Sequence, residues 1–386
     1  MIFCVIFVIL LLSAVAEAFG SKSLSILGTK GVNSKQSMKY SVSSVCFVVS
    51  AVYLWFIVAM RYETVGADIG NYVAMFNTIE HYDFSSASLE TGYAYLNLFF
   101  HNVFGSFYLM FFVIAVFCCP ACYGHIKKRC LFPCFVLCYY AQEYFLTTEM
   151  AQTRQWIAMA IICLGFNFVE EKSLIKWTLL IIVAMQFHVT AICAFPLYFT
   201  SRITIKPWFG LLLIMVACWM SLFGYSLVWW ILNFTVAIGF LPARVALLLN
   251  AYMMKETEKT QFGTGLGYLF RIVSGIYVFL LYKFAPKETQ NKMYFFNHCI
   301  GILFCALGSQ FLEFMRLANY YFICGLGFNA YSLIVLKNKF FKKAEWLQAI
   351  CTLLFLAAKA VITYASCARP GSLFRGNLPY ETFLFK

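Results

Sequence analysis

The sequence predicts an all-α protein whose helices cross a lipid bilayer many times. Hydrophobic residues make up 62% of the 386 residues, charged residues only 12%, and the mean hydropathy is +0.79. A soluble domain is nearer half apolar and a quarter charged. Many apolar runs approach the roughly 20 residues that a membrane-spanning helix needs. We therefore expect a polytopic transmembrane bundle of about 11–12 helices, forming a single integral-membrane domain over residues 1–386.

The apolar segments define the expected helices. The first is interpreted as a retained helix rather than a cleaved signal peptide, because it has no basic n-region. The stretch 207–241 fits either one long helix or two short ones. The expected segments are approximately 2–19, 41–60, 106–124, 130–147, 152–169, 174–199, 207–223, 225–241, 265–283, 293–311, 315–336 and 344–365.

Lysines in the short loops orient these segments. Twelve crossings place the main basic clusters on one side, and an excess of Lys and Arg marks the cytoplasmic side. Both termini are then predicted to be extracytoplasmic. The clusters are Lys22 to Lys39, Lys127 to Arg129, Lys283 to Lys292 and Lys337 to Lys343.

Lysine and arginine separate across this topology. Fifteen of the twenty lysines fall on the predicted cytoplasmic side, and seven of the nine arginines fall on the other. Orientation alone does not explain arginines on the outer face. A planar guanidinium with five donors suits bidentate binding of phosphate or carboxylate. The pattern predicts an anionic ligand at the outer face.

The large outer loop, about residues 61–92, combines acids and aromatic rings. It holds Arg61, Asp68, Tyr72 and Glu90, and an amphipathic segment at about 92–104 follows it. Carboxylates accept hydrogen bonds from sugar hydroxyls and rings cover sugar faces, so this composition suits a carbohydrate ligand. An ordinary solvated loop has the same composition, and both interpretations stay open here.

Three arginines lie at or near outer helix ends. Arg154 and Arg316 begin apolar segments, where a side chain that simply reaches the interface is an equally good explanation. Arg271 lies one or two turns inside its segment. A charge at that depth is costly and is expected to face the bundle interior or a wet cavity.

Two further ionisable residues fall within apolar segments. His188 lies in the outer half of the segment 174–199, where it is either a functional residue or a hydrogen-bonded helix contact. An imidazole can exchange a proton near neutral pH. Lys359, in the last segment, either pairs with an acid or extends to the interface.

The sequence gives little support to other functional classes. No basic patch carries a nucleic-acid-binding motif. Many of the sixteen cysteines lie inside apolar runs and are interpreted as small hydrophobic residues. Cys119 and Cys122 form a C-x-x-C, but at a helix end rather than in a compact metal-binding loop. We expect no metal site and no cofactor.

An ordered set of short motifs extends over nearly the whole chain. The motifs are Arg61-Tyr62-Glu63, Gly66-Ala67-Asp68, Tyr72, Phe76, Glu90-Thr91-Gly92-Tyr93, Arg154-Gln155-Trp156-Ile157-Ala158, Phe187-His188-Val189-Thr190-Ala191, Pro196, Gly265-Leu266-Gly267-Tyr268, Arg316 with Asn319-Tyr320, and Leu378-Pro379-Tyr380. This ordered set resembles the EpsG family of exopolysaccharide-biosynthesis membrane proteins. Ala67 departs from the family pattern, because the family tends to have a polar residue before the aspartate.

The resemblance implies a bacterial inner-membrane protein of capsule or exopolysaccharide synthesis, similar to Wzy-type polymerases. It implies the multi-helix membrane fold of lipid-linked-sugar glycosyltransferases. The implied reaction joins undecaprenyl-diphosphate-linked repeat units at the outer face. The implied partners are the lipid-linked oligosaccharide donor and acceptor, the bilayer and other polysaccharide assembly proteins.

Such a reaction assigns roles to the residues above. Preorganised arginines would stabilise the charge that develops on the departing diphosphate, and the acceptor hydroxyl needs a base. No D-x-D-type metal motif stands in the outer loops, so we expect a metal-independent site. The candidate bases are Asp68, Glu90 and His188. The candidate diphosphate- or sugar-binding residues are Arg61, Tyr72, Arg154, Gln155, Arg271 and Arg316.

Two alternatives compete with the transferase. A flippase for lipid-linked sugars requires a polar pathway across the whole membrane, whereas the intramembrane charges here lie mainly in the outer half, apart from Glu17. An acyltransferase that decorates a polysaccharide would suit His188 as a base, but no second histidine or acid lies at helical spacing beside it.

Overall fold

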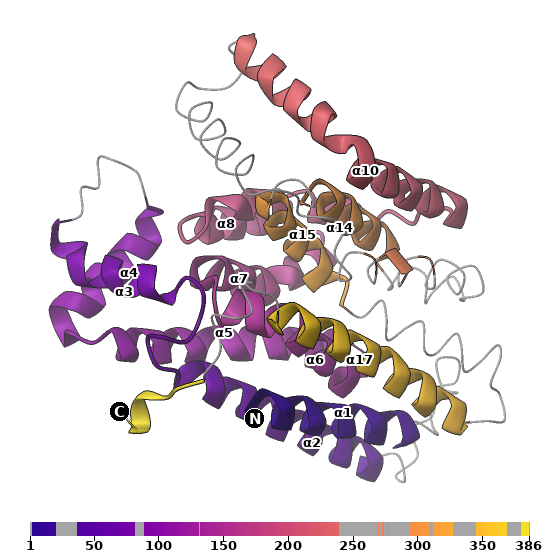
Figure 1. The fold of residues 1–386 in the computed structure, drawn as a ribbon, viewed down its shortest axis with the longest axis horizontal. Helices are drawn as coiled ribbons and strands as arrows, with labels where there is room; N and C mark the ends of the chain where they lie inside the picture. The colour runs from indigo at the N-terminus through magenta and orange to yellow at the C-terminus, as the bar shows by residue number, and fades with distance from the viewer. Residues whose placement is uncertain are drawn as a thin grey trace. The chain divides into compact units, whose positions relative to one another are not determined.

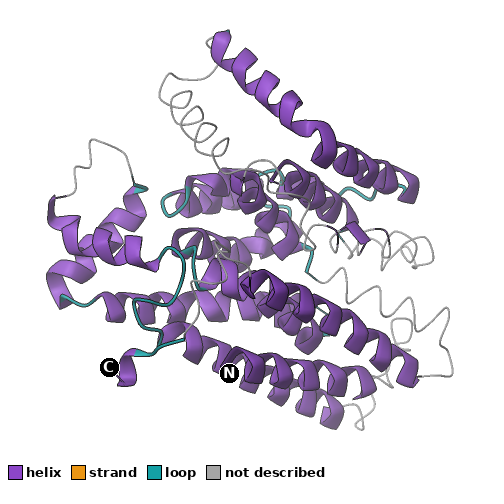
Figure 2. Ribbon diagram, viewed as in Figure 1, coloured by secondary structure: helices purple, strands orange, loops and turns teal. Residues whose placement is uncertain are grey.

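The computed structural model is helical throughout the residues that it describes (Figures 1 and 2). The described ranges are 2–20, 37–81, 89–130, 132–238, 294–308, 312–326, 345–368 and 380–385, with four single residues between 269 and 276. Within them the one β-type pairing is an isolated antiparallel bridge between Arg61 and Thr382. The chain divides into two compact units, residues 1–198 with 329–386 and residues 199–328.

The first unit contains the long N-terminal helices and the last helix. Helix α1 packs against α2, α6 and α17, and α5 packs against α2 and α7 (Figure 1). Its main helices are α1 (Ile2–Gly20), α2 (Ser37–Ala59), α5 (Phe107–Arg129), α6 (Pro133–Tyr140), α7 (Thr153–Glu170), α8 (Leu174–Met185) and α17 (Glu345–Ala368).

Helix α5 shows how the sequence sets its boundaries. Ser106 caps the start, its hydroxyl accepting a hydrogen bond from the Leu109 N–H at 3.2 Å. The last turn carries three basic residues beside the negative end of the helix dipole. Within the described residues, α5 is the one helix that is both long and apolar enough to cross a bilayer by itself, and several apolar helical stretches are shorter.

The predicted outer loop is partly helical, whereas the sequence analysis treated it as a loop. It forms α3 (Ile69–Thr78) and the short 3₁₀ turn η2 (Ile79–His81) before α4 (Thr91–Phe104). The segment 92–104, expected from the sequence to be amphipathic, forms the helix α4. Phe76 of α3 packs edge-on against His101 of α4 and against Phe107, with ring centroids 5.2 and 5.7 Å apart. This aromatic contact holds residues 61–81 and 89–104, which we call the outer segment, against the start of α5.

The expected continuous helix over 174–199 is wrong. Helix α8 ends at Met185, and the chain continues as the 3₁₀ segment η4 (Val189–Ala194) and the short α9 (Leu197–Thr200). His188 has an extended backbone, with φ −158° and ψ 114°. The carbonyl of Gln186 accepts the Tyr93 N–H at 3.1 Å, so a contact from α4 replaces a helical hydrogen bond at the break. His188 therefore lies in a turn rather than on a helix face.

The expected helix over 130–147 also changes form. After α6, residues Ala141–Glu149 form the π-helical segment η3. π-Helical turns are rare and occur frequently at functional sites. This widened segment leads directly into the start of α7.

The second unit is described in three helices, α10 (Pro207–Ala237), α14 (Phe295–Gly308) and α15 (Leu312–Cys324). Stretch 207–241 is thus mainly one long helix of 31 residues. Helix α14 packs against both α10 and α15. The expected helix over 265–283, apart from a few single residues, and the second half of 315–336 lie outside the described residues.

Two charged groups inside the first unit are paired. Lys359 of α17 forms an ion pair with Glu143 of η3, and both side chains are almost fully buried. Nearby, the Thr363 hydroxyl donates to the Gln142 carbonyl at 3.2 Å. These contacts resolve the alternatives left open for Lys359, which binds an acid.

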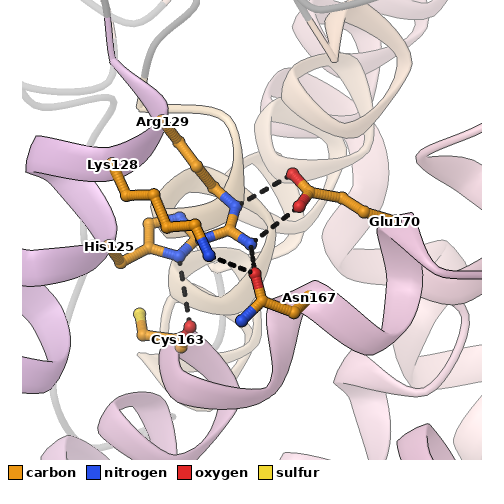
Figure 3. A network of polar contacts seen from close by, with 6 residues as sticks. All are labelled: His125, Lys128, Arg129, Cys163, Asn167 and Glu170. Carbon is orange, nitrogen blue, oxygen red and sulfur yellow. Dashed lines mark hydrogen bonds and ion pairs between the residues drawn. The ribbon is translucent and has the colours of Figure 1, made fainter.

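A second polar network joins the ends of α5 and α7 (Figure 3). Arg129 donates through Nε and Nη2 to the two Glu170 carboxylate oxygens at 3.1 and 3.0 Å. Lys128 and Arg129 both donate to the Asn167 side-chain oxygen, at 2.9 and 2.7 Å. The Glu170 side chain is 44% exposed, so this pair stays in contact with solvent.

The buried pair Lys359–Glu143 and the exposed pair Arg129–Glu170 are expected to respond differently to the removal of one charge. Lys359→Met leaves Glu143 uncompensated in the interior, which costs roughly 3–5 kcal/mol. Glu170→Gln removes an exposed partner, which costs about 0–1 kcal/mol. We expect Lys359→Met to lower the thermal unfolding temperature of the purified protein in detergent strongly and Glu170→Gln to leave it nearly unchanged. Replacing both Lys359 and Glu143 by Met should recover much of the loss, and equal unfolding temperatures for all variants would contradict the pairing.

Candidate functional site

The start of α4 is held against the turn that follows α8. Gly92 makes this approach possible, because a Cβ there would lie 2.8 Å from both the Cβ and the carbonyl oxygen of Gln186. The adjacent Tyr93 N–H donates to that carbonyl. The sequence Glu90-Thr91-Gly92-Tyr93 therefore carries a close backbone contact, and its first residue faces the turn that holds His188.

The Glu90 carboxylate joins three segments that are distant in sequence. Its Oε2 accepts a hydrogen bond from Arg154 Nη1 at 2.6 Å. Its Oε1 lies 3.1 Å from His188 Nδ1 and accepts the Val189 N–H at 3.2 Å. The starts of α4, α7 and η4 thus meet at one carboxylate.

Electrostatics keep this carboxylate ionised. Only 14% of the Glu90 side chain is exposed. Burial alone raises the pKa of Glu90, but the His188 hydrogen bond and the positive charge of Arg154 outweigh burial and lower it to about 2. At neutral pH, Glu90 is therefore a negatively charged acceptor.

Two tyrosines lie between two arginines. The Tyr72 hydroxyl of α3 lies beside the Arg154 side chain. The Tyr72 and Tyr93 rings meet edge to face with centroids 5.8 Å apart. Both tyrosines also lie near Arg61. The aromatic pair therefore connects Arg154 to the second guanidinium.

Arg61 is buried at the end of α2, with 4% of its surface exposed. Its Nη1 donates to the Glu149 carbonyl at 3.0 Å, and its guanidinium carbon lies 4.5 Å from the centre of the Phe111 ring. Its Nε and Nη2 have no hydrogen-bond partner among the described residues. A buried guanidinium with unused donors is suited to bind an anion.

Two backbone contacts fix the position of Arg61. Gly66 has φ +122°, and a Cβ there would lie 2.1 Å from the Met150 carbonyl oxygen, so the outer segment sits directly on the turn before α7. On the other side, the C-terminal residues pair with Arg61 through the Thr382 bridge, and the Glu381 carbonyl accepts the Tyr62 N–H at 2.9 Å. The C-terminal residues therefore belong to the same site.

The structure brings together five of the predicted site residues. We call Arg61, Tyr72, Glu90, Arg154 and His188 the arginine–glutamate cluster. Asp68 is adjacent to it: its backbone carbonyl accepts the N–H groups of Asn71 and Tyr72 at the start of α3, and its side chain makes no capping hydrogen bond.

The other predicted site residues are described separately from this cluster. Gln155 is buried in α7, one residue beyond Arg154. Arg316 lies on α15 in the second unit, and Arg271 lies outside the described residues. Their predicted roles stay predictions.

Glu149, whose side chain is fully buried, is not among the site residues predicted from the sequence. Its two carboxyl oxygens accept the hydroxyls of Tyr140 at 2.5 Å and Tyr123 at 2.8 Å. Its backbone carbonyl binds Arg61. An acidic residue beside an apolar segment could have indicated a buried polar contact. Its tyrosine partners are apparent only in the folded structure.

A comparison with protein families identifies the chain. The EpsG family model matches residues 44–382, which is nearly the whole length. The chain belongs to the EpsG family. Members of the EpsG family are membrane proteins associated with exopolysaccharide biosynthesis. No curated protein and no solved structure matches the chain. The residues of the arginine–glutamate cluster all lie within the EpsG match.

Gly92 provides a test of the cluster's geometry. Gly92→Ala places a methyl group 2.8 Å from Gln186 backbone and side-chain atoms, so α4 must shift and carry Glu90 away from His188. We expect a loss of about 1–3 kcal/mol in the free energy of unfolding, the usual cost of overpacking. The measurement is thermal unfolding of purified protein in detergent.

Gly70→Ala is the matched control. A Cβ at Gly70, in α3, meets nothing within 4 Å. Alanine also favours the helix over glycine by up to about 1 kcal/mol. Gly70→Ala should therefore leave the unfolding temperature unchanged or raise it slightly. If both variants behave alike, the close contact between Gly92 and Gln186 is wrong.

Proposed function

We propose that this EpsG-family protein is a glycosyltransferase that joins undecaprenyl-diphosphate-linked repeat units at the outer face of the bacterial inner membrane. The observation that carries the proposal is the Glu90 carboxylate, which binds Arg154 and His188 at once. In such a transfer, a guanidinium can stabilise the departing diphosphate, and an imidazole can accept the proton of the acceptor hydroxyl. The family match supports the setting of exopolysaccharide synthesis.

The arginines suit the leaving group. When the bond between the anomeric carbon and the diphosphate breaks, negative charge develops on the diphosphate oxygen. Arg154 and Arg61 are preorganised by Glu90, Tyr72 and the Glu149 carbonyl, so little reorganisation is needed as the charge appears. Arg154 Nε and Arg61 Nε and Nη2 are donors without partners among the described residues. Arg271 and Arg316 remain candidates for further contacts with the lipid-linked substrates.

The acceptor sugar needs a base for its hydroxyl proton, and Asp68, Glu90 and His188 are the candidates for this role. Tyr72 remains a candidate for binding the sugar or the diphosphate. The reaction proposed here uses no metal and no cofactor: two arginines supply the positive charge that a divalent cation supplies in other transferases.

We also propose a single multi-pass membrane domain with both termini extracytoplasmic. The pairing of Arg61 and Tyr62 with residues 381 and 382 supports the proposed location of the C-terminus, because these residues lie beside the start of the predicted outer loop. Lys127, Lys128 and Arg129, at the far end of α5, then face the cytoplasm.

Reporter fusions test this topology. Alkaline phosphatase, which is active only outside the cytoplasm, should be active when fused after Lys386 and inactive when fused after Arg129. A fluorescent protein that folds only in the cytoplasm should give the reverse pattern. Phosphatase activity after Arg129 but not after Lys386 would invert the proposed orientation and move the cluster to the cytoplasmic face.

Glycan analysis tests the activity. In the organism's own deletion strain we expect single repeat units to accumulate on the lipid and long polymer to disappear. A wild-type copy should restore polymer, whereas Arg154→Ala should lower chain-joining by roughly 10²–10³-fold, the usual cost of one lost donor to a developing oxyanion. The measurement is the size distribution of lipid-linked and surface glycan at matched protein levels.

Arg202→Ala is the matched control, because Arg202 is an exposed arginine on the same predicted side. It should support normal polymer length. Long polymer in the deletion strain, or normal length with Arg154→Ala, would overturn the proposal. Loss of acyl groups at unchanged chain length would instead indicate an acyltransferase, for which the Glu90–His188 contact is also suited. Translocation without elongation by the purified protein would indicate a flippase.

A further inference from the structure

The hydrogen bonds of Glu90 argue against a base role for this residue. One oxygen is bound to Arg154, and the other faces His188 Nδ1 and the Val189 N–H. Protonation of Glu90 would remove the charge that holds the half-buried Arg154. A carboxylate that three donors stabilise is also a weak base. Glu90 is therefore an acceptor and a structural anchor rather than the group that takes a proton.

The same contacts fix the tautomer of His188. An ionised carboxylate only accepts hydrogen bonds, so the His188 nitrogen that faces it, Nδ1, must carry the proton. In the neutral imidazole the lone pair is then on Nε2. His188 is 8% exposed, and Nε2 has no hydrogen-bond partner among the described residues. The free lone pair on Nε2 is thus buried, while Nδ1 faces Glu90.

The backbone holds the ring in place. The His188 N–H donates to the Ala184 carbonyl at 3.1 Å, and its carbonyl accepts the Ala191 N–H at 3.0 Å. These bonds tie the residue to the end of α8 and to η4 at the same time. Together with Glu90, they leave the imidazole little freedom to turn.

We propose that His188 Nε2 is the general base of the transfer, and that Glu90 is a positioning residue that fixes both this base and Arg154. The inference rests on the proposed function. It assigns to one residue the role of proton acceptor, for which Asp68, Glu90 and His188 were the candidates. Glu90 then sets the distance between the base and the cation that receives the leaving group.

The acceptor hydroxyl oxygen forms a bond to the anomeric carbon of the donor sugar. The bond between that carbon and the diphosphate oxygen breaks, and its electron pair leaves with the diphosphate. The acceptor proton passes to His188 Nε2, giving an imidazolium that the Glu90 carboxylate stabilises. The imidazolium releases the proton to water before the next transfer.

The remaining carboxylate candidate is less well placed. Asp68 acts electrostatically on Tyr72, and no hydrogen bond joins it to Glu90, Arg154 or His188 among the described contacts. The charged groups that face the His188 ring are Glu90 at the start of α4 and, through it, Arg154 of α7. The pH dependence of the reaction is therefore expected to follow the imidazole.

The test uses full-length protein in lipid nanodiscs with lipid-linked repeat units extracted from the deletion strain. The rate of chain growth should fall on the acidic side of the pH profile, because an imidazolium cannot accept the proton. His188→Gln should lower the rate by roughly 10²–10⁴-fold and abolish that acidic limb. His188→Ala should regain activity when imidazole is added, with the limb restored.

Glu90 variants separate positioning from simple structural support. Glu90→Gln should lower the rate by up to roughly 10⁴-fold, as when an amide replaces the carboxylate that orients a base histidine. It should also shift the acidic limb to lower pH, because the imidazolium loses its ionic partner. Glu90→Asp should keep the limb near its wild-type position. A variant that merely misfolds would lower the yield of protein without moving the limb.

The control is a second His–Glu pair on the outer segment. His101 Nε2 lies 3.2 Å from Glu80, whose side chain is 58% exposed. His101→Gln should keep the wild-type rate and pH profile. Full activity and an unchanged limb in His188→Gln, or no effect of imidazole on His188→Ala, would overturn the assignment. Absence of chain growth by wild-type protein would instead count against the proposed function.

Discussion

One buried carboxylate holds together three segments of this EpsG-family protein that are distant in sequence. Glu90 is largely removed from water, which by itself disfavours its charge, yet three donors from two other segments surround it. Removing one partner of such a group costs more than the pair contributes, because the other charge stays buried. The positions of Arg154 and His188 are therefore coupled, and so are the starts of α4, α7 and η4. The outer segment cannot move without breaking this contact.

Two glycines make the contact sterically possible. At Gly66 and Gly92 the backbone of the outer segment lies so near Met150 and Gln186 that a side chain would collide. Gly66 also adopts a positive φ that other residues rarely accept. Backbone approaches of this kind position polar side chains more firmly than a solvated loop does. They explain how an outer segment of mixed composition places charged residues reproducibly.

Much of the fold was predictable from apolar length, because a run of about 20 apolar residues has few alternatives to a helix in a membrane. The residue types of the site were predictable as well, since Arg61, Glu90, Arg154 and His188 are costly where they stand. The pairing of Glu90 with Arg154 and His188 was not predictable. Glu90 and His188 are 98 residues apart, whereas an acidic partner on the same helix would lie only three or four residues from His188. The break after α8 was missed because its cause, the Tyr93 contact with Gln186, is tertiary.

Buried charges outside the arginine–glutamate cluster have local structural partners. Glu17 accepts from the Ser43 hydroxyl and the Phe135 N–H, and Glu143 pairs with Lys359. In the arginine–glutamate cluster, nitrogens of Arg61, Arg154 and His188 are buried without hydrogen-bond partners among the described residues, as are polar atoms of Asn97 and Gln142 elsewhere. Unmet hydrogen bonds cost free energy. The cluster differs in that its unmet groups are cationic or basic nitrogens, and under the proposed function phosphate oxygens and a sugar hydroxyl of the substrate would satisfy them.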